Sequence, residues 1–280
     1  MRRYRIDHAT TYSYSDVVSS SYGRGYLAPR EMPGQRCRSH RLVVDPEPAD
    51  TSSGCDVYGN VMSYFHVTTE HQTLTVRGES VVEVDETPLR LPSTPWELCA
   101  PTGTAVEFRL DLDPPEIDDV VKAYAEQSFS PGRPLGEAVA ELTGRIYADF
   151  TYRSGSTTVS TRVADVLGAR EGVCQDFARV AIACLRSQGL AARYVSGYLA
   201  TDPPPGKERM VGADATHAWA AVWTGSDWLA FDPTNNQFAD ERYVTVAWGR
   251  DYVDVAPLRG IIYTDSKAST ITVSVDVLPI

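Results

Sequence analysis

Cys174 is the residue of this chain whose surroundings are best suited to nucleophilic chemistry. A glycine-containing loop, Glu171-Gly172-Val173, leads into a segment whose apolar spacing predicts an amphipathic helix. The first turn of a helix favours a thiolate, the nucleophilic form of cysteine, and its backbone N–H groups can hold an oxyanion. The alternative interpretation, a small buried apolar residue, suits Cys184 in the apolar stripe of the same helix better than Cys174.

A cysteine nucleophile needs a histidine as its base, and the histidine needs a third group that fixes its tautomer. The chain has five histidines, and only His217 follows the predicted helix. It opens a strand pattern that runs to Trp223, after which a second strand ends at Asp232. Taken separately, His217 could be a half-buried strand residue and Asp232 could be the start of a turn.

The hairpin between these strands can be tested by its register. A two-residue turn at positions 225–226 pairs Thr224 with Asp227. His217, Trp219 and Asp232 then fall on one face of the hairpin, because side chains alternate along a strand. Diagonal neighbours on one face are about 7–8 Å apart at Cα, which a histidine and a carboxylate can bridge. The spacing therefore predicts a Cys174–His217–Asp232 triad.

The elements that must position this triad change in character along the chain. Residues 1 to about 88 carry short runs of β-branched and aromatic residues, beginning with the alternation of Tyr4, Ile6 and His8, and predict a sandwich-like β-domain. A proline-rich linker follows, to about residue 116. Helical patterns open at Pro115, Leu135 and Val173, and strand patterns succeed them, so the predicted fold class is α+β. We divide the chain into a β-domain with its linker, 1–105, and a core, 106–280.

Composition places the chain among globular proteins, with 42% hydrophobic and 22% charged residues in a length of 280. A net charge of −11 disfavours nucleic acid and anionic membrane as partners. No run approaches the roughly 20 apolar residues that span a bilayer, and the basic N-terminus lacks the apolar stretch of a secretory signal. Five cysteines with no CxxC pair indicate free thiols, and we expect a cytoplasmic protein.

The sequence resembles the bacterial branch of the transglutaminase-like superfamily over nearly its whole length and in the family's order. In the predicted core the resemblance rests on Phe150-Thr151-Tyr152, on 172–178 (GVCQDFA), on 190–198 (LAARYVSGY), on 213–219 (ADATHAW), on 231–235 (FDPTN) and on 249–252 (GRDY). In the predicted β-domain it rests on 27–30 (LAPR) and 56–60 (DVYGN).

The resemblance implies a papain-like core in which Cys174 is the nucleophile, His217 the base and then the acid, and Asp232 the orienting carboxylate. Animal members of the superfamily use an upstream tryptophan N–H as an oxyanion donor, but the only upstream tryptophan here is Trp96, in the linker, so this role is not transferred. Tyr152 could supply a hydroxyl instead, or be a core aromatic. No DxDxDG calcium loop is present, and neither a metal nor a cofactor is implied.

For two features of the resemblance, the sequence allows either a functional or a structural role. Trp219 could form a wall of the acyl-binding cleft, although packing in the core is the commoner fate of a strand tryptophan. The segment Gly249-Arg250-Asp251-Tyr252 could line the site, but an ion pair that holds the C-terminal strands is the favoured interpretation.

The predicted function is acyl transfer through a thioester, with a peptide, a protein or a small amide as substrate. Resolution by water would make a protease or amidase, and resolution by an amine would make a transglutaminase or amide ligase. We favour hydrolysis because water is always present. The alternative from another class is a binding or assembly module with a vestigial triad, and the oligomeric state has no signal in the sequence.

Overall fold

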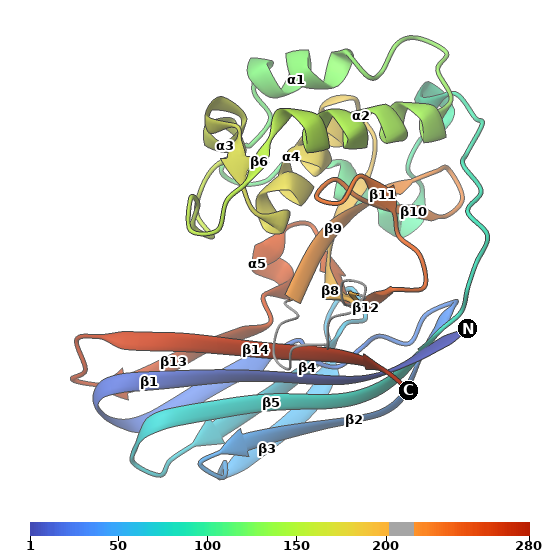
Figure 1. Ribbon diagram of the computed structural model, residues 1–280. Helices are drawn as coiled ribbons and strands as arrows, with labels where there is room; N and C mark the ends of the chain where they lie inside the picture. The colour runs from blue at the N-terminus through green and yellow to red at the C-terminus, as the bar shows by residue number, and fades with distance from the viewer. Residues whose placement is uncertain (202–215) are drawn as a thin grey trace, which may run out of the picture.

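The computed structural model describes residues 1–201 and 216–280, and its elements form two layers. A sheet of long strands makes up one layer, and the helices together with a second sheet lie over it (Figure 1). This arrangement of helices and antiparallel sheets confirms the predicted α+β class. No helix in the described ranges is both long and apolar enough to cross a membrane.

The lower layer is a seven-stranded sheet built around one very long strand, β1. Its path runs β2-β5-β1-β4-β3, with β13 and β14 also paired to β1. The strands are β1 (Arg2–Gly25), β2 (Gln35–Asp45), β3 (Asp50–Cys55), β4 (Val61–Val67), β5 (His71–Val84), β13 (Leu258–Thr264) and β14 (Ser269–Pro279). The predicted alternation at the start of β1 is confirmed, because Tyr4, Ile6 and His8 are all buried.

Strand β1 belongs to both halves of this layer, and the layer therefore has a sandwich-like character. Its first part pairs with β5 and β14, and its last part pairs with β4 and β13. Phe65 and Val67 of β4 share a buried apolar cluster with Leu74 and Val76 of β5, although these two strands do not pair. The two halves are therefore packed on a common interior.

The two C-terminal strands differ from the sequence-based division of the chain, which assigned them to the core. Strand β14 pairs with β1 from Tyr4↔Pro279 to Tyr14↔Ser269, and β13 pairs with the far end of β1. The N-terminal layer is thus closed by residues from both ends of the chain (Figure 1). Long-range pairing of this kind leaves no local pattern in the sequence, because any strand with suitable alternation could fill the position.

The linker and the helices come next along the chain. The linker contains η1 (Trp96–Leu98) and η2 (Gly103–Arg109), and the helices are α1 (Asp119–Glu126), α2 (Leu135–Asp149), α3 (Val163–Ala169), α4 (Cys174–Ser187) and α5 (Tyr252–Val255). The predicted second helix is confirmed, with Val139, Leu142 and Ile146 buried on one face. The first helix starts later than predicted, because the side chain of Asp118 accepts a hydrogen bond from Val121 N at 2.9 Å and caps it there.

The core sheet lies against α4, the helix that begins at the predicted nucleophile. Its order is β11-β10-β9-β8-β12, with β8 (Ala192–Leu199), β9 (Thr216–Trp223), β10 (Trp228–Asp232), β11 (Gln237–Phe238) and β12 (Tyr243–Gly249). Two short strands, β6 (Thr151–Tyr152) and β7 (Glu171–Gly172), pair in parallel beside α4. Apolar residues of α4, among them Phe177 and Ala181, share one core with Ala220 of β9. The proline-rich run at 203–206 (PPPG), for which the sequence predicts a loop, and residues 213–215 of the resemblance lie outside the described residues.

Buried polar contacts hold the core sheet to the N-terminal layer. The side chain of Gln35 accepts from Thr245 N at 2.8 Å and donates to Thr245 O at 2.7 Å, so that β12 is hydrogen-bonded to the other layer. Asn60 makes the equivalent pair of contacts with the backbone of Trp248, at 2.9 and 2.8 Å. These contacts fix the sheet that carries the candidate site.

Candidate functional site

Cys174 is the first residue of α4, as the sequence predicts, and its side chain is half-buried. Asp176, in the same turn, is 1% exposed and accepts a hydrogen bond from Val173 N at 2.9 Å. It also accepts from the hydroxyl of Thr157 at 2.6 Å, which ties the preceding loop to the helix start. Gly172 is required beside it, because a Cβ there would lie 2.8 Å from the Cβ of Asp176. The helix start is therefore rigidly built.

His217 and Asp232 meet across the predicted hairpin. The register Trp228↔Trp223 to Phe231↔Ala220 confirms the two-residue turn, and Thr224 N donates to Asp227 O at 2.8 Å. His217 Nε2 donates to Asp232 Oδ2 at 2.7 Å. Because Nε2 is occupied by the carboxylate, Nδ1 is the ring nitrogen left for Cys174, whose side chain is close enough to contribute to the raised pKa of His217. The three residues of the predicted triad lie together.

Asp232 is held from several sides, although it is 0% exposed. Its Oδ1 accepts from Thr234 N at 2.8 Å, and its Oδ2 accepts from Asn235 Nδ2 and from the hydroxyl of Tyr243, both at 2.7 Å. Buried charges persist only when they are paired and hydrogen-bonded in this way. Asn235 and Tyr243 were not among the predicted site residues. Asn235 lies within the quoted run at 231–235, which was the available signal, whereas Tyr243 carries none.

The electrostatics of the pair favour a charged histidine. Burial alone would lower the pKa of His217, but hydrogen bonds to Asp232 and Cys174 and their negative charges outweigh it and raise that pKa to about 9. Burial would raise the pKa of Asp232, yet the hydrogen bonds from His217, Asn235 and Tyr243 keep it below its usual value. The imidazolium form is therefore the stable one at neutral pH.

Trp219 and Tyr152, the two aromatic residues considered for substrate binding, lie in different surroundings. Trp219 is 1% exposed and packs with Tyr243, with the ring centroids 5.2 Å apart, and its ring lies 6.0 Å from that of His217 in a stacked arrangement. A side chain buried to this degree is not accessible for direct contact with substrate. Trp219 instead packs against the ring of His217. Tyr152 is 55% exposed, which excludes a core role, and the charge of Cys174 contributes, after burial, to raising its pKa. Tyr152 is thus the accessible aromatic residue beside the thiol.

Trp96 and the segment 249–252 both have structural contacts. The indole N–H of Trp96 donates to Ser130 O at 3.0 Å, so it is already engaged away from the triad. Asp251 accepts from Arg179 of α4 at 2.9 Å, and Arg179 also pairs with Glu116 at 3.1 Å. Within residues 1–201 and 216–280, no group of three or more His, Cys, Asp or Glu side chains is placed to hold a metal ion.

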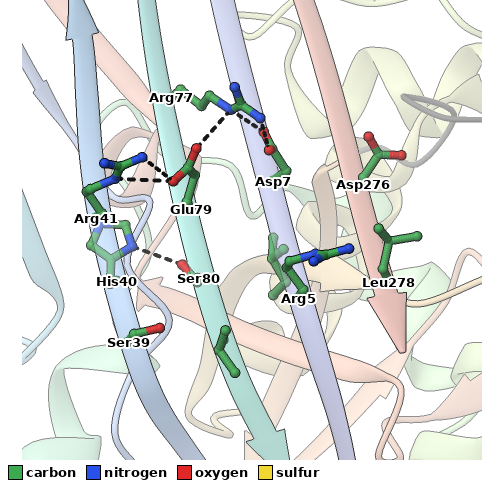
Figure 2. Close-up of a pocket in the computed structure, with 12 residues that line it drawn as sticks. Arg5, Asp7, Ser39, His40, Arg41, Arg77, Glu79, Ser80, Asp276 and Leu278 are labelled. Atoms are coloured by element: carbon green, nitrogen blue, oxygen red, sulfur yellow. Dashed lines mark hydrogen bonds and ion pairs between the residues drawn. The ribbon is translucent and has the colours of Figure 1, made fainter. Parts of the chain in front are cut away.

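A cavity of about 690 Å³ lies elsewhere, on the face of the N-terminal layer that points away from the core (Figure 2). Its charged side chains bond to one another: Arg77 pairs with Asp7 and Glu79, and Arg41 donates to Glu79 at 2.8 Å. His40 is bonded to Ser80 at 2.9 Å. Ion pairs between Arg77 and Asp7 and between Arg41 and Glu79 join neighbouring strands, as is ordinary on a sheet face, and the lining of this cavity holds no nucleophile comparable with Cys174.

Models of known protein families match a part of each of the two layers. A family model described as the bacterial transglutaminase-like N-terminal region matches residues 4–83, and the model of the transglutaminase-like superfamily core matches residues 122–233. The second range contains Cys174, His217 and Asp232.

Relatives and solved structures extend this likeness to the full chain. An uncharacterized protein of Mycobacterium tuberculosis is 61% identical over 99% of this chain and 93% of its own length. An uncharacterized protein of Mycobacterium leprae is 34% identical over 99% of both chains. A crystal structure from Cytophaga hutchinsonii, provisionally assigned as a cysteine protease, has the same fold, with a TM-score of 0.75 at 21% identity over 98% of this chain and 90% of its own. The chain belongs to the bacterial branch of the transglutaminase-like superfamily, a family of cysteine-based enzymes.

Proposed function

We propose that this protein is a cysteine-nucleophile acyl-transfer enzyme that cleaves amide or peptide bonds through a thioester. The observation that carries the proposal is the position of His217 between two partners, Asp232 at 2.7 Å on Nε2 and the side chain of Cys174. A histidine whose tautomer and charge are fixed by a buried carboxylate is the arrangement that activates a thiol for attack on a carbonyl.

The first half-reaction forms the thioester. The sulfur of Cys174 attacks the carbonyl carbon of the substrate, and the carbonyl π electrons move to its oxygen. Cys174 begins α4, where backbone N–H groups have no helical partner and can stabilise that oxyanion. As the C–N bond breaks, His217 gives its Nδ1 proton to the leaving amine, which departs neutral.

The second half-reaction consumes the thioester. His217, now neutral, takes a proton from a water molecule while the water oxygen attacks the acyl carbon. The C–S bond breaks, a carboxylic acid leaves, and Cys174 and His217 return to their starting state. Water is preferred over an amine as the acceptor because it is always available. Tyr152, exposed beside Cys174, is the proposed side chain that contacts the substrate.

A turnover assay tests this proposal on a panel of glutamine-containing and short peptides, amidated at the C-terminus. We expect the wild-type protein to release ammonia or amine and a new carboxylate from at least one substrate, and Cys174→Ala to release none. Cys184→Ala is the matched control, because it removes a thiol from the same helix but away from the site. Adding a primary amine separates the two outcomes of the thioester, since a cross-linking enzyme would incorporate the amine in preference to water.

Two results would count against the proposal. Equal turnover by the wild-type protein and by Cys174→Ala would remove the cysteine mechanism. No turnover of any peptide, together with a slow reaction of Cys174 toward alkylating agents, would favour a non-catalytic binding or assembly module of the same fold.

A further inference from the structure

A second cavity, of about 470 Å³, lies where the N-terminal layer, the linker and the core sheet meet. Tyr58 comes from the turn before β4, Phe108 from η2, Trp228 from β10 and Trp248 from β12. The ring of Phe108 lies 5.4 Å from Tyr58 and 5.3 Å from Trp228, so the walls are a continuous aromatic surface. The volume suits a small-molecule site, and its walls combine aromatic rings with a few polar side chains.

Arg193 of β8 also lines this cavity, and its side chain is clamped between two tryptophans. Its guanidinium carbon is 3.7 Å from the ring centroid of Trp248 and 4.3 Å from that of Trp228. Arg193 is only 8% exposed. With both faces of the guanidinium covered by aromatic rings, its N–H groups remain available only in the plane of the group, along its edge.

No residue in the described part of the chain hydrogen-bonds to the guanidinium of Arg193 or forms an ion pair with it, and its Nε is buried without a partner. Burial, and then the positive charge of Arg30, lower the pKa of Arg193 to about 9, against the opposing charge of Asp227. Arg186, a buried arginine of α4, provides the contrast, because it donates to Phe108 O, Ala192 O and Arg250 O. Among the described residues, Arg193 has no such partners.

The rest of the cluster increases the local positive charge. Arg30 stacks on Trp248 with its guanidinium carbon 3.5 Å from the ring centroid, and its hydrogen bonds go to Asn60 and to Tyr58 O, which are neutral. The two carboxylates of the lining bond to neighbouring lining residues and not to Arg193. Asp227 accepts from Trp228 N at 2.7 Å, and Glu107 accepts from the hydroxyl of Tyr58 at 3.5 Å.

We propose that Arg193 and the aromatic walls around it form a binding site for a small organic monocarboxylate. A carboxylate can accept two in-plane N–H bonds from the edge of a guanidinium, and a flat apolar body would rest against Tyr58 and Phe108. Single charge is preferred because Asp227 and Glu107 lie on the rim, and they would repel a doubly charged phosphate. Binding would satisfy a buried cation that otherwise carries its full desolvation cost.

This site is separate from the triad. Arg193 pairs with Ala221 and Gly197 pairs with His217, so the two sites are four positions, or roughly 13 Å, apart along β8. The proposal is therefore independent of turnover, and a carboxylate should bind whether or not Cys174 is reactive.

Titration of the full-length protein with benzoate, followed by tryptophan fluorescence and calorimetry, tests the site. We expect benzoate to bind saturably to the wild-type protein and to Cys174→Ala. The neutral isostere benzamide should not bind to either protein. Arg193→Met keeps an apolar group between the tryptophans, so it should fold with equal or higher stability and lose roughly tenfold or more in benzoate affinity. Asp227→Asn should bind benzoate more tightly, because it removes a repelling charge.

Arg41→Met is the matched control, since it removes an arginine whose side chain is 71% exposed on the other layer, and it should leave benzoate affinity unchanged. Three results would overturn the proposal: no saturable binding of benzoate at millimolar concentration, equal affinity in Arg193→Met and the wild-type protein, or tighter Arg193-dependent binding of inorganic phosphate than of benzoate. If Arg193→Met does not fold, Arg193→Lys serves in its place, because it keeps the charge and loses the bidentate edge.

Discussion

His217 and Asp232 are separated by 15 positions in the chain, and their side chains are joined at 2.7 Å between Nε2 and Oδ2. The two-residue turn between β9 and β10 brings them to the same face, and the full burial of Asp232 makes the contact strong. Among the contacts that raise the pKa of His217, this one contributes most to the charge state of the candidate active site.

Replacing Asp232 by asparagine should therefore reduce turnover without changing the shape of the site. The analogous change in serine triads costs about 10⁴ in rate, and we expect a smaller loss here because a Cys–His pair is already charged at rest. The pKa of His217 should fall below about 9, so the alkaline limb of kcat/KM against pH should move to lower pH. Tyr243→Phe removes only one hydrogen bond to Asp232 and should shift that limb less. An unmoved limb in Asp232→Asn would contradict the assignment.

The same contact predicts how stability depends on pH. The pKa of His217 is raised from 6.5 to about 9, so its contribution to the free energy of unfolding is fully present below pH 6.5 and is lost as pH rises through 9. Asp232 has a lowered pKa, so its contribution is present above 3.8 and is lost only in stronger acid. Urea unfolding at pH 6 and pH 10 checks this, and the loss of stability between them should be smaller in His217→Gln than in the wild-type protein. An equal loss in both proteins would show that other groups cause it.

The two cysteines of α4 should separate chemistry from packing. Cys184 is 0% exposed, and burial raises the pKa of its thiol to about 12, so Cys184→Ala should cost about 1 kcal/mol of stability and leave turnover unchanged. Cys174→Ala should abolish turnover and change the melting temperature little, since its side chain is only half-buried. Thermal unfolding and the peptide assay together measure both. A large loss of stability in Cys174→Ala would indicate a packing role.

Arg179 joins α4 to distant segments, and its replacement should lower the free energy of unfolding. It is 8% exposed and bonds to Glu116 and Asp251, so Arg179→Ala leaves two carboxylates without their buried partner and should cost on the order of 3 kcal/mol. Arg41→Ala is the control, because its pair with Glu79 is solvent-exposed and should be worth under about 1 kcal/mol. Urea denaturation distinguishes them, and similar costs would contradict the structural role given to Arg179.

The features that sequence could predict are those set by local rules. The hairpin register followed from one turn, and α2 followed from the spacing of Val139, Leu142 and Ile146. The helix start at Cys174 followed from the loop before it. The carboxylate of Asp232 could be placed beside His217 because both belong to one hairpin.

The features that sequence could not predict depend on distant segments. The hydroxyl of Tyr243 reaches Asp232 from β12, two strands beyond β9 in the sheet, and nothing in its neighbours marks it. The pairing of β14 with β1 joins the two ends of the chain. Trp219 lies on the face of the hairpin that the sequence predicts. Its burial depends on Tyr243 and Val195, so strand alternation alone could not decide whether it lines the cleft or packs in the core.

The measurement that tests the central claim most directly is the rate at which iodoacetamide alkylates each cysteine at pH 6, followed by mass spectrometry of the peptides. The thiolate is the reactive form, and an ordinary thiol is mostly protonated at this pH. Cys55 is exposed and serves as the internal reference. A nucleophile paired with His217 should react faster at Cys174 than at Cys55, and His217→Ala should remove the difference. Alkylation of Cys174 no faster than that of Cys55 would contradict the account.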